Sequence, residues 1–171
     1  TKSFNAFSSI DYPETAVFRD MRLIPFLRRP DPMPPVQFYE QLDPAVFVLR
    51  LVPGMRADII PLLAPHYRAL VVESFGVGGL PGGEHGEMYA RLQDWCASGR
   101  LAVFTTQVPH EGCDLAVYEV GRSVKELPGV LEARDMTPEA VAVKLMWALG
   151  QTTDRTEAMR LFATPVEWDI V

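Results

Sequence analysis

The residues best placed to do chemistry in this 171-residue sequence lie around a glycine-rich stretch, GVGGLPGG at positions 76–83. The stretch follows an apolar run typical of a buried strand and precedes a helical pattern, which is where open parallel sheets bind ligands. A dinucleotide fingerprint needs a third glycine where this sequence has Pro81, and a phosphate-binding loop needs Gly-Lys-Ser/Thr at its end. We therefore expect a backbone-rich rim that meets a ligand or a neighbouring subunit. The purely structural alternative is a tight turn with positive φ at several glycines.

Hydroxyl groups gather at the predicted ends of neighbouring strands, in Ser74, Thr105 and Thr106. The carboxyl ends of parallel strands form one edge of a sheet, and binding sites collect there. A hydroxyl nucleophile also needs an adjacent base. No histidine, lysine or carboxylate has an obvious spacing for that task, and Glu73 and Asp114 could serve only if the fold brought them in. The sequence therefore predicts no self-sufficient set of catalytic residues.

A short cluster of potential metal ligands comprises His110, Glu111, Cys113 and Asp114. Zinc sites usually combine two spaced pairs of ligands, and the sequence holds no matching second pair. Cys96 falls on the apolar stripe of a predicted helix, and Cys113 has no neighbouring Lys or Arg to activate its thiol. We expect both cysteines to be unreactive, and we expect neither a metal nor another cofactor.

The composition narrows the class of protein. Sixteen Lys and Arg against 22 Asp and Glu give a net charge of -6, which argues against nucleic-acid binding. Apolar runs are far shorter than the roughly 20 residues that a membrane-spanning helix needs. Two cysteines are too few for a secreted disulfide framework and suit a reducing cytoplasm. The sequence predicts a cytoplasmic globular domain with neither nucleic-acid nor membrane partners.

Strand and helix patterns alternate from about residue 43 onward. Nearly continuous β-branched and aromatic runs suit strands buried on both faces, as in a parallel sheet. These runs are residues 46–52, 69–75 and 101–106. Helices are expected from near Met55 to 61–65, around residues 88–96, from Pro138 behind Thr137 to Gly150, and from about Asp154. The alternation predicts an α/β fold: a small three-layer domain with a parallel sheet of about four strands flanked by helices.

The opening stretch has a different composition. Residues 1–42 hold six of the 15 prolines and no sustained periodicity, which predicts an irregular, extended connector. The sequence starts with Thr1 rather than Met, so we expect the C-terminal piece of a longer protein. An N-terminal threonine can act as a nucleophile, but Thr1 opens a polar, irregular stretch that would not hold it rigidly.

Several stretches, taken in order, resemble the C-terminal domain of bacterial-type L-asparaginases, nearest the cytoplasmic type I branch. No single stretch is diagnostic, but the ordered set covers nearly the whole chain. The matching stretches are SFNAFSS (3–9), VPGM (52–55), LVVESFGVGGLP (70–81), VFTTQ (103–107), YEVG (118–121), and DMTPEA (135–140) followed by KL (144–145).

The resemblance implies an amidohydrolase that converts L-asparagine to L-aspartate and ammonia. In that family a catalytic threonine and a Thr-Asp-Lys set lie in a larger N-terminal domain, whose TGGTI and GTDT signatures are absent here. Residues 1–42 would be the tail of that domain and the interdomain linker, and residues 43–171 the C-terminal domain. The family forms homodimers or tetramers in which the glycine-rich loop approaches the partner's active site. The residues implied at this substrate rim are Ser74, Phe75, Gly76, Gly78 and Gly79.

Three positions depart from the family pattern. Many relatives have Asn at the position of Gly79, so this chain can offer only backbone there. Some type I relatives bind a regulatory asparagine with Arg and Cys where this sequence has Glu73 and Val108. Because Glu reverses the charge that would face a carboxylate, we expect no such regulatory site. Two alternatives stay open: an asparaginase-like subunit of a tRNA-dependent amidotransferase, or a non-catalytic binding or dimerisation domain.

Overall fold

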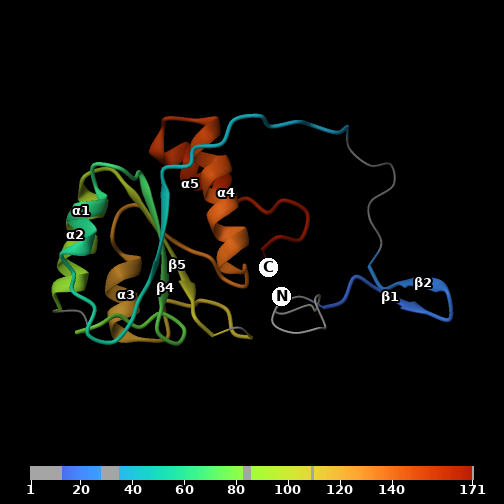
Figure 1. Ribbon diagram of the computed structural model, residues 1–171, viewed down its shortest axis with the longest axis horizontal. Helices are drawn as coiled ribbons and strands as arrows, with labels where there is room; N and C mark the ends of the chain where they lie inside the picture. Colours follow the sequence, from blue (N-terminus) through green and yellow to red (C-terminus); the bar gives the residue numbers. More distant parts are fainter. Residues whose placement is uncertain (1–12, 28–34, 83–85, 109, 171) are drawn as a thin grey trace.

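A four-stranded parallel sheet forms the centre of the molecule (Figure 1). The computed structural model describes residues 13–27, 35–82, 86–108 and 110–170. Across the sheet the strands run in the order β3 (Val46–Arg50), β4 (Ala69–Ser74), β5 (Leu101–Thr106) and β6 (Val130–Glu132). β4 and β5 are buried along their whole length, as continuous apolar runs in a parallel sheet should be. The run at 46–52 was also predicted to be buried on both faces, which is wrong: β3 lies at the edge of the sheet and its Val48 is exposed. The predicted α/β class, with about four parallel strands between helices, is confirmed.

Helices cover both faces of the sheet and make three layers (Figure 1). One face carries α1 (Ile59–Leu63), α2 (Glu87–Ala97) and α3 (Glu119–Lys125), and the other carries α4 (Pro138–Gln151) and α5 (Arg155–Ala163). Side chains alternate along each strand. Val72 and Phe104 therefore join the core with α1 and α2, while Val71 and Val103 join the core with α4 and α5.

Most helix ends lie close to where the sequence predicts them. The side chains of Thr137 and Asp154 accept hydrogen bonds from backbone N–H groups in the first turns of α4 and α5. α1 is shorter than predicted, because it begins at Ile59 rather than near Met55. Pro61 then lies in the first turn, where backbone N–H groups have no partner within the helix and proline costs little.

The connector contains a β-hairpin that the sequence pattern did not predict. β1 (Ala16–Arg19) pairs antiparallel with β2 (Arg22–Pro25). The turn between them runs through Asp20 and Met21, which have φ of +48° and +61°. Such turns usually carry glycine or asparagine, so this one left no recognisable signal in the sequence. Figure 1 shows the hairpin lying away from the central sheet.

The segment that enters β3 is fixed along α4. Gln151 Nε2 donates to the Gln41 carbonyl at 2.8 Å, and the Asp43 N–H donates to the Met146 carbonyl at 2.9 Å. The backbones approach so closely that a Cβ on Gly150 would lie 2.5 Å from the Gln41 oxygen. α4 continues through this glycine to Gln151, one residue beyond the predicted end.

Among the described helices, none is both long and apolar enough to cross a membrane. The predictions that concern Thr1 and residues 3–9 lie outside the described residues.

Candidate functional site

The glycine-rich loop leaves the carboxyl end of β4 and folds back on itself. The Gly79 N–H donates to the Phe75 carbonyl at 2.7 Å, and the Phe75 N–H donates to the Gly79 carbonyl at 3.0 Å. φ is +52° at Gly76 and +153° at Gly78, a region that residues with a side chain rarely adopt. Glycine therefore allows a closed turn at this edge of the sheet.

Two hydroxyl groups hold the loop and the strand ends together. Ser74 is fully buried, lies opposite Thr106 in the parallel register, and donates to the Thr105 carbonyl at 2.8 Å. Thr106 Oγ1 donates to the Gly76 carbonyl and accepts a hydrogen bond from the Val108 N–H at 3.0 Å. The fold thus brings the predicted hydroxyl groups together, but these two bind backbone atoms rather than a general base.

A segment before α3 supports the other side of the loop. The Asp114 N–H donates to the Val77 carbonyl at 3.0 Å, and Cys113 Sγ lies 3.6 Å from the same oxygen. Tyr118 lies against the loop, because a Cβ on Gly76 would be 3.2 Å from its hydroxyl oxygen. Burial, helped by nearby carboxylates, raises the pKa of the Cys113 thiol to about 12, so it is neither a nucleophile nor a ready metal ligand at neutral pH. Within the described ranges no three His, Cys, Asp or Glu side chains are placed to hold a metal ion.

A second group of polar side chains lies where β3, β4 and β5 end side by side. Gln107 Nε2 bridges two strands, donating to the Leu51 carbonyl at 2.7 Å and the Glu73 carbonyl at 2.9 Å. Arg50 Nη1 lies 3.3 Å from Glu73 Oε2, and the two residues are register partners. Thr105 Oγ1 is buried and has no hydrogen-bond partner among the described residues. The Glu73 carboxylate is therefore paired with a cation rather than with a hydroxyl group that it could activate.

The five residues predicted at a substrate rim fall into two groups. Ser74 and Gly78 are buried, whereas Phe75, Gly76 and Gly79 are partly exposed. The Phe75 and Gly79 N–H groups bond within the turn, so the carbonyl groups of the partly exposed Gly76 and Gly79, each with a second lone pair, are what it can present to a ligand. It holds no group that could transfer a proton, so the arrangement is suited to contact and not to catalysis.

A family model described as the Glutaminase/Asparaginase C-terminal domain matches residues 45–162. The chain belongs to this family. It is 35% identical, over 170 residues, to an L-asparaginase of Thermococcus kodakarensis; the match covers 97% of this chain and 50% of that protein. The solved structure of a thermostable L-asparaginase from Thermococcus kodakarensis superimposes with a TM-score of 0.89 at 34% identity, over 99% of this chain and 51% of that one.

Two further matches extend the comparison, and the first of them is not named as an asparaginase. A glutamyl-tRNA(Gln) amidotransferase subunit of Metallosphaera sedula is 34% identical over 171 residues, which is 96% of this chain and 37% of that protein. L-asparaginase I from Vibrio cholerae shares the fold, with a TM-score of 0.83 at 24% identity over 97% of this chain and 50% of that one. The chain thus spans half the length of the asparaginases it matches, and less of the amidotransferase protein.

The family pattern explains features that the reasoning from single residues missed. The YEVG stretch packs against the loop through Tyr118, and a Cβ on Gly121 would overlap the Leu115 carbonyl. Gly121 was visible in the sequence, but its close approach depends on α3, which the periodicity did not predict. A Cβ on Gly79 would lie 3.1 Å from the Phe75 oxygen, so the closed turn leaves little room for a side chain at this position.

Proposed function

We propose that the intact protein is an asparaginase-type amidohydrolase that converts L-asparagine and water to L-aspartate and ammonia. The observation that carries this proposal is the match to an L-asparaginase over almost the whole chain, at 35% identity and with the same fold. The chain accounts for half of that relative, and the Ser74 and Thr106 hydroxyls at its sheet edge bind backbone carbonyls. We therefore assign the catalytic threonine and its base to the half of the fold that this chain does not represent.

We propose a division of roles along the chain. Residues 1–42 serve as the tail of the catalytic domain and the linker, and residues 43–171 as the C-terminal domain. The turn formed by residues 75–79 contacts the substrate region of a neighbouring protomer in a cytoplasmic homodimer or tetramer. Its partly exposed position at Gly76 and Gly79 supports this role, as does its anchoring to β5 through Thr106.

We also propose that the regulatory asparagine site of some type I relatives is absent from this protein. Glu73 occupies the position where those relatives carry Arg, and its carboxylate is paired with Arg50 at 3.3 Å. Titration of the chain with L-asparagine in a calorimeter tests this point. Saturable binding that is lost in Glu73→Ala would contradict it.

Ammonia release from L-asparagine provides the main test. The purified 171-residue chain should release none above a heat-inactivated sample. Adding the separately produced N-terminal half of the Thermococcus kodakarensis asparaginase should restore turnover if the two halves associate. Turnover by the chain alone, from a preparation whose intact mass excludes full-length enzyme, would overturn the assignment of catalysis.

A second function is favoured by the match to the glutamyl-tRNA(Gln) amidotransferase protein. In that case the intact protein would release ammonia for transamidation of a tRNA-linked glutamate. The two proposals differ in what the intact protein requires. Turnover of free asparagine without tRNA or other subunits supports the first, and ammonia production only in the presence of a glutamyl-tRNA complex supports the second.

A further inference from the structure

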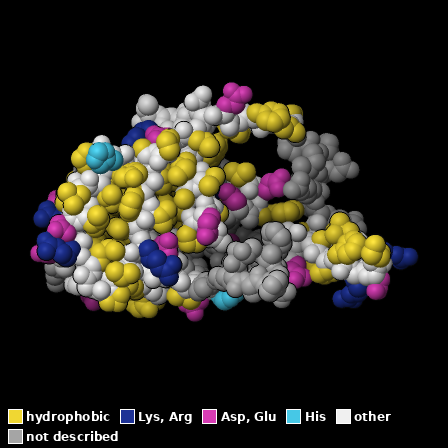
Figure 2. Space-filling model, viewed as in Figure 1, with side chains coloured by type: hydrophobic (Ala, Val, Ile, Leu, Met, Phe, Trp, Pro, Cys, Tyr) yellow, Lys and Arg dark blue, Asp and Glu magenta, His cyan; other side chains and the backbone are white. Residues whose placement is uncertain are grey.

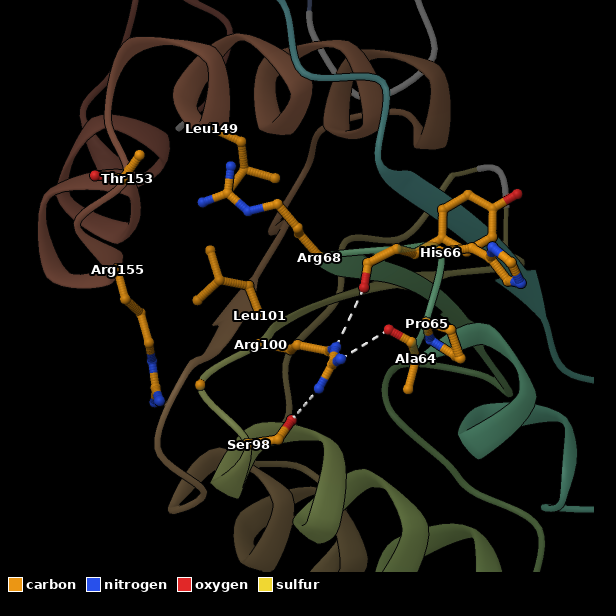
Figure 3. Close-up of a pocket in the computed structure, with 12 residues that line it drawn as sticks. Ala64, Pro65, His66, Arg68, Ser98, Arg100, Leu101, Leu149, Thr153 and Arg155 are labelled. Atoms are coloured by element: carbon orange, nitrogen blue, oxygen red, sulfur yellow. Dashed lines mark hydrogen bonds between the residues drawn. The ribbon is translucent and has the colours of Figure 1, made fainter.

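A cavity of about 390 Å³ opens at the edge of the sheet opposite the glycine-rich loop. Its walls come from the segments that lead into β4 and β5 and from the connection between α4 and α5 (Figure 3). Leu101 and Leu149 provide an apolar part of the wall. A volume of this size is in the range of pockets that hold small ligands.

The charged groups that line this cavity are all basic. They are Arg68, Arg100 and Arg155, with His66 beside them, and no Asp or Glu is present among the described lining residues. Figure 3 shows the three arginines arranged around Leu101: Arg68 and Arg100 come just before β4 and β5, and Arg155 begins α5. This contrasts with the net charge of -6 and with the face in Figure 2, where Lys and Arg side chains are interspersed with Asp and Glu. The cavity concentrates positive potential, which attracts anions.

Arg100 is held in place by neutral acceptors. It donates to the Ala64 carbonyl at 2.7 Å, the Tyr67 carbonyl at 3.2 Å and Ser98 Oγ at 2.6 Å (Figure 3). These bonds fix the guanidinium without cancelling its charge. A guanidinium carries five N–H donors, so some of its donors are left for a ligand.

Arg155 and Arg68 complete the set. Arg155 donates to the Cys96 carbonyl at the end of α2, 3.2 Å away, and its guanidinium lies close against Gly129. A Cβ on Gly129 would lie 2.7 Å from Arg155 Nη2. Arg68 is paired with Asp43 at 2.6 Å, so one of the three charges is balanced by a carboxylate.

We propose that this cavity binds a small phosphate-bearing anion, either inorganic phosphate or a phosphate monoester. Planar guanidinium groups match the oxygen geometry of phosphate and bind it through parallel charge-assisted hydrogen bonds. The apolar wall at Leu101 and Leu149 lowers the local dielectric constant on that side, which strengthens those bonds. The inference does not rest on the proposed function, because the cavity lies away from the glycine-rich loop.

Titration of the 171-residue chain tests the inference directly. Inorganic phosphate, glycerol phosphate and L-aspartate are added separately at constant ionic strength, while NMR follows the arginine Nε–Hε signals. Saturable shifts of the Arg100 and Arg155 signals with inorganic phosphate support the free anion as ligand, and tighter binding of glycerol phosphate supports a monoester. Shifts with aspartate alone, linear shifts, or none would overturn the proposal.

Matched variants give a second measurement. Arg155→Gln should weaken phosphate binding about tenfold, the loss expected for hydrogen bonds from a charged donor. Arg91→Gln removes the same charge from the exposed face of α2, where Arg91 lies 3.6 Å from Asp94, and should leave affinity unchanged within about twofold. Equal weakening in both variants would overturn the proposal. If Arg155→Gln does not fold, the signal shifts in the unaltered chain still decide the matter.

Discussion

Replacing Thr106 by valine should destabilise the fold, although the two side chains have nearly the same shape. The Thr106 hydroxyl donates to the Gly76 carbonyl and accepts from the Val108 N–H. Each hydrogen bond contributes about 0.5–1.5 kcal/mol, so the loss of both should lower the free energy of unfolding by about 2 kcal/mol. The cost stays near this value because Gly76 and Val108 are partly exposed and water can reach the groups left behind.

The neighbouring threonine offers a matched control. Thr105 is buried, and its Oγ1 has no hydrogen-bond partner among the described residues. Replacement by valine removes a desolvated polar group and keeps the packing volume. Thr105→Val should therefore leave stability unchanged or raise the free energy of unfolding by about 1 kcal/mol.

Urea unfolding followed by circular dichroism at about 25 °C measures both variants, with the slope m checked for constancy. Amide hydrogen exchange at Gly78 and Gly79 adds a local measurement, because loss of the Thr106 anchor should speed exchange in the turn. Equal destabilisation by the two substitutions would refute the reasoning, since it would mean that the hydroxyl contacts do not decide the outcome. So would a Thr106→Val protein as stable as the original.

Three further outcomes follow from close backbone approaches and from burial. Gly150→Ala should lower the melting temperature in thermal unfolding, because the new Cβ would lie 2.5 Å from the Gln41 oxygen. This cost should outweigh the preference of alanine over glycine in a helix, which is about 1 kcal/mol. Gly121→Ala should cost about 2 kcal/mol in urea unfolding, since its Cβ would overlap the Leu115 carbonyl. Burial raises the pKa of the Cys113 thiol from its ordinary 9.0 to about 12. As the pH rises, the thiol therefore ionises in the unfolded chain before it does in the folded one. The free energy of unfolding should fall between pH 9 and 12 as a result. Cys113→Ala should show a shallower fall, and an identical pH profile would contradict this.

The strongest local signals in the sequence predicted most of the sheet and its helices. Strands β3, β4 and β5 were recognisable because they are continuous apolar runs, although only β4 and β5 are buried throughout and β3 is a partly exposed edge strand. The cap at Thr137 marked the start of α4, because a capping side chain acts within one turn, and α5 begins one residue after the expected Asp154. β6 and α3 escaped prediction: β6 has three half-buried residues, and α3 has seven residues with Gly121 among them.

The sequence predicted where the candidate site lies, but it did not predict what the side chains of the site bind. A glycine-rich stretch after a buried strand is a local feature, so the position of the turn followed from the pattern. Whether a hydroxyl group faces a ligand or a carbonyl depends on the register between strands. Ser74 illustrates this, because it lies opposite Thr106 and is fully buried, with its hydroxyl on the Thr105 carbonyl.

Glu73 shows why one position cannot be interpreted alone. Compared with the family pattern, it reverses a charge, and from the sequence that change indicated only the loss of a regulatory site. In the structure its register partner across β3 is Arg50, and the two side chains form an ion pair at 3.3 Å. β3 thus supplies a positive charge beside this carboxylate on β4. Because Arg50 and Glu73 are 23 residues apart in sequence, only the parallel register makes this pairing visible.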